Sequence, residues 1–233
     1  MCGIVGYIGD REAADFLMDG LAKLEYRGYD SAGIAVYNDG AIAVRKKAGR
    51  LVNLAEEVKA HPVVGTLGIG HTRWATHGGP SDVNAHPHTD EKGNFAIVHN
   101  GIIENYMELK EELLKKGYHF KSETDTEVVA HLCADMYDGD FTSTVRKVLA
   151  CLRGSYSLVF MCKFEPDKII CSKKDNPLII GLGQGENYIA SDIPAILSYT
   201  RKTYIMNDGE IAIVMKDNVW VTDLEGKPIS KKV

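Results

Sequence analysis

Long hydrophobic runs are absent from this sequence. No apolar stretch reaches the roughly 18–20 residues that a membrane-spanning helix requires, so we expect no contact with a membrane. The first ten residues contain no Lys or Arg, and glycines interrupt their apolar stretch at positions 3, 6 and 9. This start therefore does not have the basic region and continuous apolar core of a secretory signal.

Excess positive charge and paired cysteines are also missing. Lys and Arg number 27 against 32 Asp and Glu, a net charge of −5, and the two signs are interspersed, so no nucleic-acid partner is expected. The cysteines are odd in number and have no C-x-x-C spacing; they are Cys2, Cys133, Cys151, Cys162 and Cys171. They argue against a disulfide framework or a zinc site and predict a cytoplasmic location.

Phosphate-binding loops are the third absence. The segment GLGQGE, residues 181–186, has its third glycine out of register with G-x-G-x-x-G, and a strand-like run follows it instead of a helix. The sequence has no G-x-x-x-x-G-K-[ST] motif either. We therefore expect no cofactor.

The apolar pattern that is present predicts an α+β protein. With 233 residues of which 45% are hydrophobic, the chain can bury one large core or two small ones. Helical spacing predicts a helix capped by Asp10 and ending near Gly28, and further helices over 51–61, 104–117, 125–138, 140–154 and near 193–198. Strand patterns cover 4–8, 31–47 as a hairpin, 66–75, 94–101, and seven runs between 155 and 223. Strands, then helices, then strands in long blocks favour mostly antiparallel sheets.

Cys2 allows two interpretations. It is either a small hydrophobic residue at the edge of a buried strand, or, once Met1 is removed, a nucleophile that carries its own α-amino group as a base. The amine suits that task because its ordinary pKa of about 7.7–8.0 lies near neutral pH. The spacing alone does not decide between the two.

A long loop over residues 76–92 follows a strand that ends near Arg73. The loop is rich in Gly, Pro, His and Asn, which is typical of a functional segment. His71, His77, His86 and His88 lie in or beside it, but their spacing matches no known metal motif, so no metal is expected. A guanidinium at the strand end is suited to gripping a carboxylate, which favours an amino-acid substrate.

Two further segments carry polar groups that are suited to binding. In VHNGIIEN, Asn100 and Gly101 form either a plain turn or a pair of donors for an oxyanion. In SETDTEV, Ser122 or Thr124 is a candidate helix cap, and Asp125 is a candidate partner for a substrate ammonium group.

The segments CGIVGYIG, LEYRGYDSAG, HTRWATHG, NAHPH, VHNGIIEN and SETDTE follow one another in this order. In this combination the sequence resembles the glutaminase domains of the glutamine:fructose-6-phosphate amidotransferases, a branch of the class II glutamine amidotransferases. The resemblance covers residues 2 to about 225. It implies an N-terminal nucleophile (Ntn) hydrolase fold, a four-layer αββα sandwich with two stacked antiparallel sheets. It also implies one glutaminase domain over 1–225 and, over 226–233, the start of a linker to a sugar-phosphate isomerase region.

The resemblance further implies a chemistry. Cys2 would attack the side-chain amide of L-glutamine, and water would hydrolyse the γ-glutamyl thioester to release glutamate and ammonia for conversion of fructose 6-phosphate to glucosamine 6-phosphate. The implied site residues are Cys2, Asn100 and Gly101 for catalysis, Arg73, Trp74, Thr76, His77 and Asp125 for glutamine binding, and Arg27 near the nucleophile. The parent enzyme would be a homo-oligomer. The alternatives are a class II amidotransferase with a different acceptor domain, or a binding module in which Met1 masks the nucleophile.

Overall fold

The computed structural model describes residues 2–233, and its strands form two antiparallel sheets. The seven-stranded sheet has the order β11 (Thr203–Ile205), β9 (Ile179–Leu182), β10 (Asn187–Ala190), β1 (Gly3–Ile8), β4 (Leu67–Arg73), β2 (Ser31–Asn38), β3 (Ala41–Ala48). The six-stranded sheet has the order β13 (Val219–Thr222), β12 (Ile211–Met215), β8 (Lys168–Lys174), β7 (Gly154–Cys162), β6 (Phe95–Ile103), β5 (His88–Thr89).

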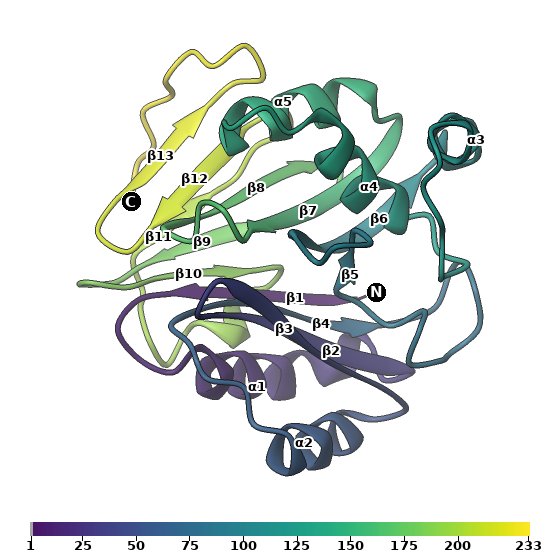
Figure 1. The fold of residues 1–233 in the computed structure, drawn as a ribbon. Helices are drawn as coiled ribbons and strands as arrows, with labels where there is room; N and C mark the ends of the chain where they lie inside the picture. Colours follow the sequence, from purple (N-terminus) through teal and green to yellow (C-terminus); the bar gives the residue numbers. More distant parts are fainter. Residues whose placement is uncertain (1) are drawn as a thin grey trace.

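Helices cover the outer face of each sheet (Figure 1). On the seven-stranded sheet lie α1 (Ala13–Leu24) and α2 (Leu51–Ala60), and on the six-stranded sheet lie α4 (Glu127–Met136) and α5 (Phe141–Cys151), with α3 (Tyr106–Lys115) beside α4. Short 3₁₀ helices span Glu25–Arg27 and Ile193–Ala195. The predicted four-layer αββα sandwich is therefore confirmed.

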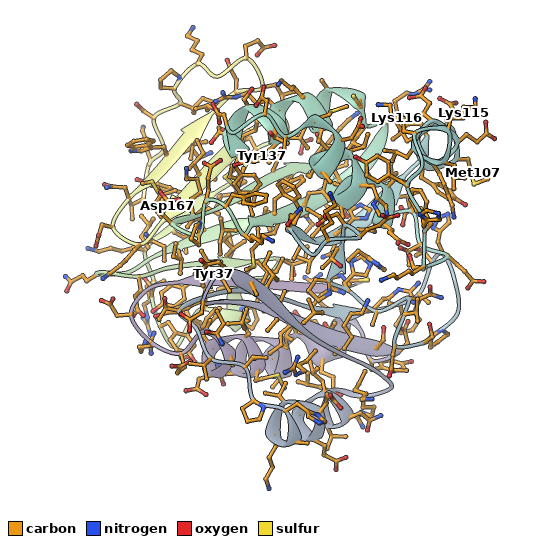
Figure 2. All side chains as sticks on the ribbon, viewed as in Figure 1. Tyr37, Met107, Lys115, Lys116, Tyr137 and Asp167 are labelled. Atoms are coloured by element: carbon orange, nitrogen blue, oxygen red, sulfur yellow. The ribbon has the colours of Figure 1, made fainter. Side chains whose placement is uncertain are left out.

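Both faces of the central strands are buried, which explains their nearly continuous apolar sequences. In β1, Val5 and Tyr7 face α1, whereas Ile4 and Ile8 face the other sheet, because successive side chains of a strand point to opposite faces. In β7, Phe160 likewise belongs to the helix side and its neighbour Val159 to the layer between the sheets. Figure 2 shows side chains filling these layers, with Met107 and Lys115 of α3 pointing outward.

The hairpin of β2 and β3 has its predicted turn, with Asp39 and Gly40 at positive φ angles of 43° and 82°. The predicted helix caps are wrong. Asp10 does not cap α1; its carboxylate pairs with Lys216 at 2.5 Å.

Neither Ser122 nor Thr124 caps α4, which is flanked by Thr126 without a side-chain cap bond. Instead, the carboxylate of Glu127 accepts the backbone N–H of Lys121 at 2.9 Å and that of Ser122 at 2.7 Å. The side chain of Glu127, inside the helix, therefore accepts backbone N–H groups of the segment before it. The prediction was the reverse, with a side chain of that segment capping the helix.

Several strand ends meet at one edge of the sandwich. Gly3 of β1 pairs with Thr72 of β4, and Arg73 of β4 pairs with Ser31 of β2. From the other sheet, the Asn100 side chain of β6 reaches the backbone of Cys2. The topology thus brings residues far apart in the sequence to one place.

We expect Phe160→Ala to lower the free energy of unfolding by about 3–5 kcal/mol, because it leaves a cavity under the helices of the six-stranded sheet. Phe160 is fully buried, whereas Phe164 is 51% exposed. Phe164→Ala is the matched control and should cost less than about 1 kcal/mol. Urea unfolding of both variants provides the measurement, and equal losses would contradict this assignment of the core.

Candidate functional site

A cavity of about 290 Å³ opens at the edge where the strand ends meet. Every residue that the sequence assigned to the site lines it: Cys2, Arg27, Arg73, Trp74, Thr76, His77, Asn100, Gly101 and Asp125. The fold therefore gathers one thiol, an amide, two guanidinium groups and one carboxylate around a space suited to a small polar molecule.

The Cys2 thiol is held by the backbone of Trp74. The Trp74 N–H donates to Cys2 Sγ at 3.1 Å, and the thiol lies 3.5 Å from the Trp74 carbonyl oxygen, to which it donates. Burial raises the pKa of the Cys2 thiol above its usual value, although the hydrogen bond from Trp74 acts in the opposite direction. The thiol is therefore protonated at neutral pH and needs a base to become the reactive thiolate.

Asn100 connects the nucleophile to the other sheet. Its Nδ2 donates to the Cys2 carbonyl oxygen at 3.1 Å, and its Oδ1 lies 3.0 Å from His71 Nε2. The same Nε2 is 3.0 Å from the carbonyl oxygen of His99, and because both neighbours are acceptors, Nε2 carries the proton. His71 thereby fixes the amide with its nitrogen toward Cys2.

His71 is fully buried, and burial lowers its pKa to about 3. The imidazole is therefore neutral at physiological pH, with a single N–H that donates to Asn100 and a bare Nδ1 that has no partner among residues 2–233. Its ring stacks on that of His86 at a centroid distance of 4.2 Å. A neutral, stacked ring gives the Asn100 contact a defined geometry.

Gly101 requires glycine for two reasons. Its φ angle is 118°, a conformation that other residues rarely adopt, and a Cβ at this position would lie 2.1 Å from the carbonyl oxygen of Ser155. The strand therefore passes close to β7 beside the cavity.

Arg73 is a buried cation without an acidic partner. Its guanidinium donates to the carbonyl oxygens of His77, of Gly78 at 3.0 Å and of Gly79 at 3.4 Å. Among residues 2–233, no carboxylate forms an ion pair with it. Neutral carbonyls leave its charge uncompensated, so the cavity wall attracts an anion.

Asp125 supplies the opposite charge. It is 4% exposed, and its Oδ2 accepts the Ile103 N–H at 2.7 Å and lies 4.0 Å from His99 Nδ1. Thr126 Oγ1 is 3.4 Å from its other oxygen. A cavity that holds both this carboxylate and the Arg73 guanidinium is suited to a zwitterion such as an amino acid.

The remaining assigned residues occupy the rim. Trp74 is half exposed and meets Tyr29 edge-on at a centroid distance of 5.2 Å, and His77 Nδ1 lies 3.4 Å from Thr76 Oγ1. Arg27 forms an ion pair with Asp192, which anchors it beside the cavity. These groups are placed to contact a ligand in the cavity.

Comparison with known proteins identifies the family. Residues 71–198 match the family model described as a glutamine amidotransferase domain. Proteins named glutamine–fructose-6-phosphate aminotransferase (isomerizing) from Caldanaerobacter subterraneus subsp. tengcongensis and Aquifex aeolicus are 57% and 54% identical over 233 residues. The chain belongs to the glutamine amidotransferase family. It is fully covered in both comparisons but spans only 38% and 39% of the two relatives' lengths.

Solved structures agree with this assignment. The glutamine phosphoribosylpyrophosphate amidotransferase of B. subtilis superposes on this amidotransferase domain with a TM-score of 0.83 at 28% identity, covering 96% of this chain and 49% of that one. A glutamine aminotransferase class-II domain protein from Silicibacter pomeroyi shares the fold, with a TM-score of 0.65 at 15% identity and coverage of 96% and 99%. The expected Ntn hydrolase fold is therefore confirmed.

Sequence reasoning did not assign to the site several polar residues of the cavity that contains Cys2. His86, His99, Thr124, Thr126, Ser155 and Asn176 also line it. His71 was considered only as a metal ligand, but it positions Asn100; its place in the apolar run TLGIGH, on a strand buried throughout, was the signal for a structural hydrogen bond.

Residues 2–233 contain neither a metal-binding cluster nor a membrane-spanning helix. No group of three or more His, Cys, Asp or Glu side chains is placed to hold a metal ion. No helix in this range is long and apolar enough to cross a bilayer. The predicted removal of Met1 concerns a residue outside the described range.

We expect acid to destabilise the domain from about pH 6.5 downward. Burial lowers the pKa of His71 to about 3 and also lowers the pKa values of His86, His88 and His99. Between the unfolded value of about 6.5 and these folded values, the unfolded chain binds more protons, so stability is lost as the pH falls. His71, His86 and His88 each contribute a loss of about 1 kcal/mol between pH 6.5 and 5.5, and His99 contributes in the same direction.

Urea unfolding at pH 7.5, 6.5 and 5.5 measures this loss, which should total several kcal/mol. His119→Gln replaces an imidazole that is 86% exposed and is the control, which should retain the same pH dependence. A stability that stays constant from pH 7.5 to 5.5 would contradict the buried, neutral state of these histidines.

Proposed function

We propose that this domain hydrolyses L-glutamine to glutamate and ammonia, with Cys2 as the nucleophile. The observation that carries the proposal is the position of the Cys2 thiol, which the Trp74 backbone holds in the cavity that Arg73 and Asp125 also line. A zwitterionic substrate matches that pair of charges, and its side-chain amide is the group for which a thiol nucleophile is suited.

The reaction begins with attack of the Cys2 thiolate on the amide carbon. A C–S bond forms, and the carbonyl oxygen takes the negative charge, which Asn100 Nδ2 and the Gly101 N–H stabilise as an oxyanion hole. The C–N bond then breaks, and ammonia leaves with a proton from the catalytic base. Water attacks the resulting γ-glutamyl thioester and releases glutamate and the free thiol.

The α-amino group of Cys2 is the proposed base. The raised pKa of the thiol makes a base necessary, and an amine on the same residue needs no further positioning. This role requires removal of Met1 because an amide nitrogen cannot accept the proton.

Substrate recognition follows from charge and position. Arg73 binds the α-carboxylate and Asp125 the α-ammonium group, since each is a buried charge on the cavity wall without a full counter-charge at hydrogen-bond distance. Trp74, Thr76 and His77 contact glutamine from the rim, and Arg27 lies near the nucleophile.

Within a longer protein, the ammonia would be used to convert fructose 6-phosphate to glucosamine 6-phosphate. The relatives named for that aminotransferase support this proposal, because the chain spans 38% of the first relative's length and leaves room for a sugar-phosphate isomerase region. We further propose a homo-oligomeric parent enzyme in the cytoplasm, which suits five free cysteines.

We expect Cys2→Ala to reduce glutamine turnover by at least roughly 10³-fold while glutamine binding persists, because only the nucleophile is removed. Cys151→Ala, on α5 and outside the cavity, is the matched control and should retain activity. Glutamate release by protein whose intact mass confirms loss of Met1, together with calorimetric binding, provides the test. Substantial turnover by Cys2→Ala would remove Cys2 from the nucleophile role.

We expect Arg73→Ala to raise KM for glutamine roughly 10- to 100-fold, the cost of losing a charged hydrogen-bond partner. Asp125→Asn should also raise KM. This substitution removes the charge but keeps the structural contact, because the amide oxygen can still accept the Ile103 N–H. Steady-state kinetics of both variants measure the effect. If KM is unchanged in both, the substrate does not lie between these two charges.

A further inference from the structure

A second cavity, of about 700 Å³, lies between β3 and the segment that runs from β5 to α4. Its walls include Val44, Arg45, Lys46, Glu57, His61, Asp82, Val83, Pro87, His88, Thr89, Lys121, Ser122 and Glu127. The hydrogen bond between His88 Nε2 and Thr124 Oγ1, at 3.1 Å, separates it from the glutamine cavity, which Thr124 lines. The proposed hydrolysis of glutamine uses none of its residues.

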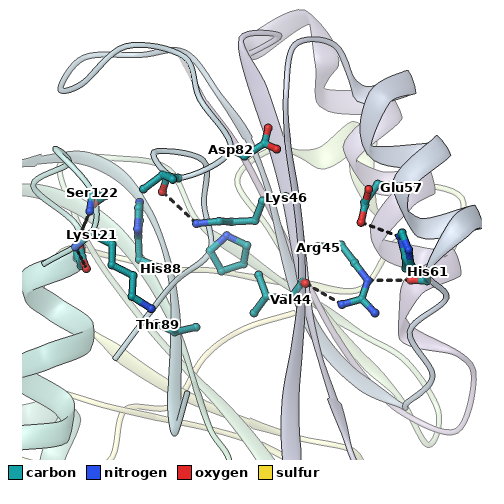
Figure 3. A pocket seen from close by; sticks show the side chains of 13 residues that line it. Val44, Arg45, Lys46, Glu57, His61, Asp82, His88, Thr89, Lys121 and Ser122 are labelled. Carbon is teal, nitrogen blue, oxygen red and sulfur yellow. Dashed lines mark hydrogen bonds and ion pairs between the residues drawn. The ribbon is translucent and has the colours of Figure 1, made fainter. Parts of the chain in front are cut away.

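Two ammonium groups and one hydroxyl, those of Lys46, Lys121 and Thr89, line this second cavity. Figure 3 shows Lys46 and Lys121 extending into it from opposite walls, with the Lys121 ammonium near Thr89. Lys46 Nζ donates only to the Val83 carbonyl oxygen, at 3.1 Å. Among residues 2–233, neither ammonium pairs with a carboxylate, and neither Lys121 Nζ nor the Thr89 hydroxyl has a hydrogen-bond partner.

The carboxylates of the second cavity are engaged elsewhere. Asp82 accepts the Ala48 N–H at 2.7 Å and pairs with Lys47 at 3.2 Å. Glu127 accepts the Ser122 hydroxyl at 2.6 Å in addition to two backbone N–H groups. These donors occupy the carboxylate oxygens, and neither Asp82 nor Glu127 forms an ion pair with Lys46 or Lys121.

Arg45 and Glu57 are the remaining cation and carboxylate of the cavity wall, and they lie on the side of β3 away from Lys46. Figure 3 shows Arg45 pointing toward Glu57 and His61, away from Lys46. Arg45 Nε donates to the His61 carbonyl oxygen at 2.8 Å, and Glu57 lies 3.0 Å from the His61 ring. At the end of the cavity beside His88, Lys46 and Lys121 are therefore left without an ion-pair contact among residues 2–233.

Burial also disfavours the charged form of Lys46. Burial lowers the pKa of Lys46 to about 8. The positive charges of Lys121 and Arg73 also lower this pKa, whereas the carboxylates of Glu127 and Asp82 raise it. The attraction of an anion between the two lysines would offset the cost of burial and the repulsion between the positive charges.

We propose that Lys46, Lys121 and Thr89 form a binding site for a small phosphate-bearing anion, either inorganic phosphate or a phosphate monoester. Two ammonium groups and a hydroxyl match the charge and the acceptor oxygens of a phosphate. A volume of about 700 Å³ exceeds that of phosphate itself, and Val44, Val83 and Pro87 provide an apolar wall for an organic group.

Calorimetric titration of the 233-residue chain with sodium phosphate, with sodium chloride at matched ionic strength as the reference, tests this site. We expect saturable binding of one phosphate. Lys46→Met and Lys121→Met should each weaken it roughly tenfold or more, because each removes a charged donor but keeps the side-chain stem. Lys202→Met changes an exposed lysine outside the cavity and should bind as the unaltered chain does.

Arginine variants separate a binding role from a structural one. Lys46→Arg and Lys121→Arg keep the charge and should retain phosphate affinity within a few-fold, which keeps the test decisive if a methionine variant fails to fold.

Repeating the titration with glycerol phosphate distinguishes the sources: tighter binding than inorganic phosphate supports a monoester, and equal binding supports phosphate alone. Absence of phosphate-specific heat, or affinity that both methionine variants leave unchanged, overturns the site; so does loss of binding in Arg73→Ala alone, which would assign the anion to the glutamine cavity.

Discussion

The site depends on a hydrogen-bond chain that crosses from one sheet to the other. His71 on β4 donates to Asn100 on β6, and Asn100 donates to the backbone of Cys2 at the start of β1. Because β4 and β1 belong to one sheet and β6 to the other, this chain fixes the separation of the sheets at the edge where the cavity opens. Its strength rests on a buried imidazole that stays neutral, since a charged ring at this place would lack compensation.

The other parts of this cavity follow from the same strand. Two residues after His71, Arg73 ends β4, and the next residue, Trp74, holds the thiol through its backbone. The strand therefore positions the amide, the cation and the nucleophile within four residues of its own sequence. The guanidinium of Arg73 in turn binds the carbonyl oxygens of residues 77–79, so the position of the loop that borders the cavity depends on the charge that we propose for substrate binding.

Much of the fold was predictable because period-two and helical patterns are local. The Asp-Gly turn of the β2–β3 hairpin and the blocks of strands and helices needed no tertiary information. The helix caps were predicted wrongly because the helices begin later than expected. The helix α1 begins at Ala13 and α4 at Glu127, so Asp10 and Ser122 lie before the cap positions and bond to Lys216 and Glu127 instead.

The site residues were predicted as a set, but the residues that hold them in position were not. Arg73, Asn100 and Asp125 are residue types that suggest binding chemistry, and the resemblance to a known family gave each of them an expected role. His71 and Asn100 are 29 positions apart, and only the stacking of the two sheets brings the His71 ring to Asn100 and to the carbonyl oxygen of His99. Their role required the three-dimensional register between β4 and β6, which no sequence period encodes.

The most direct test of this cross-sheet chain compares His71→Phe with His71→Gln in glutamine hydrolysis. Phe fills the space of the ring but cannot donate to Asn100, whereas Gln retains a donor. We predict that His71→Phe lowers kcat roughly tenfold or more with little change in KM, because an oxyanion donor acts in the transition state, and that His71→Gln recovers most of the rate. Equal kcat in the Phe variant and the unaltered domain, or a loss confined to KM, would contradict the account.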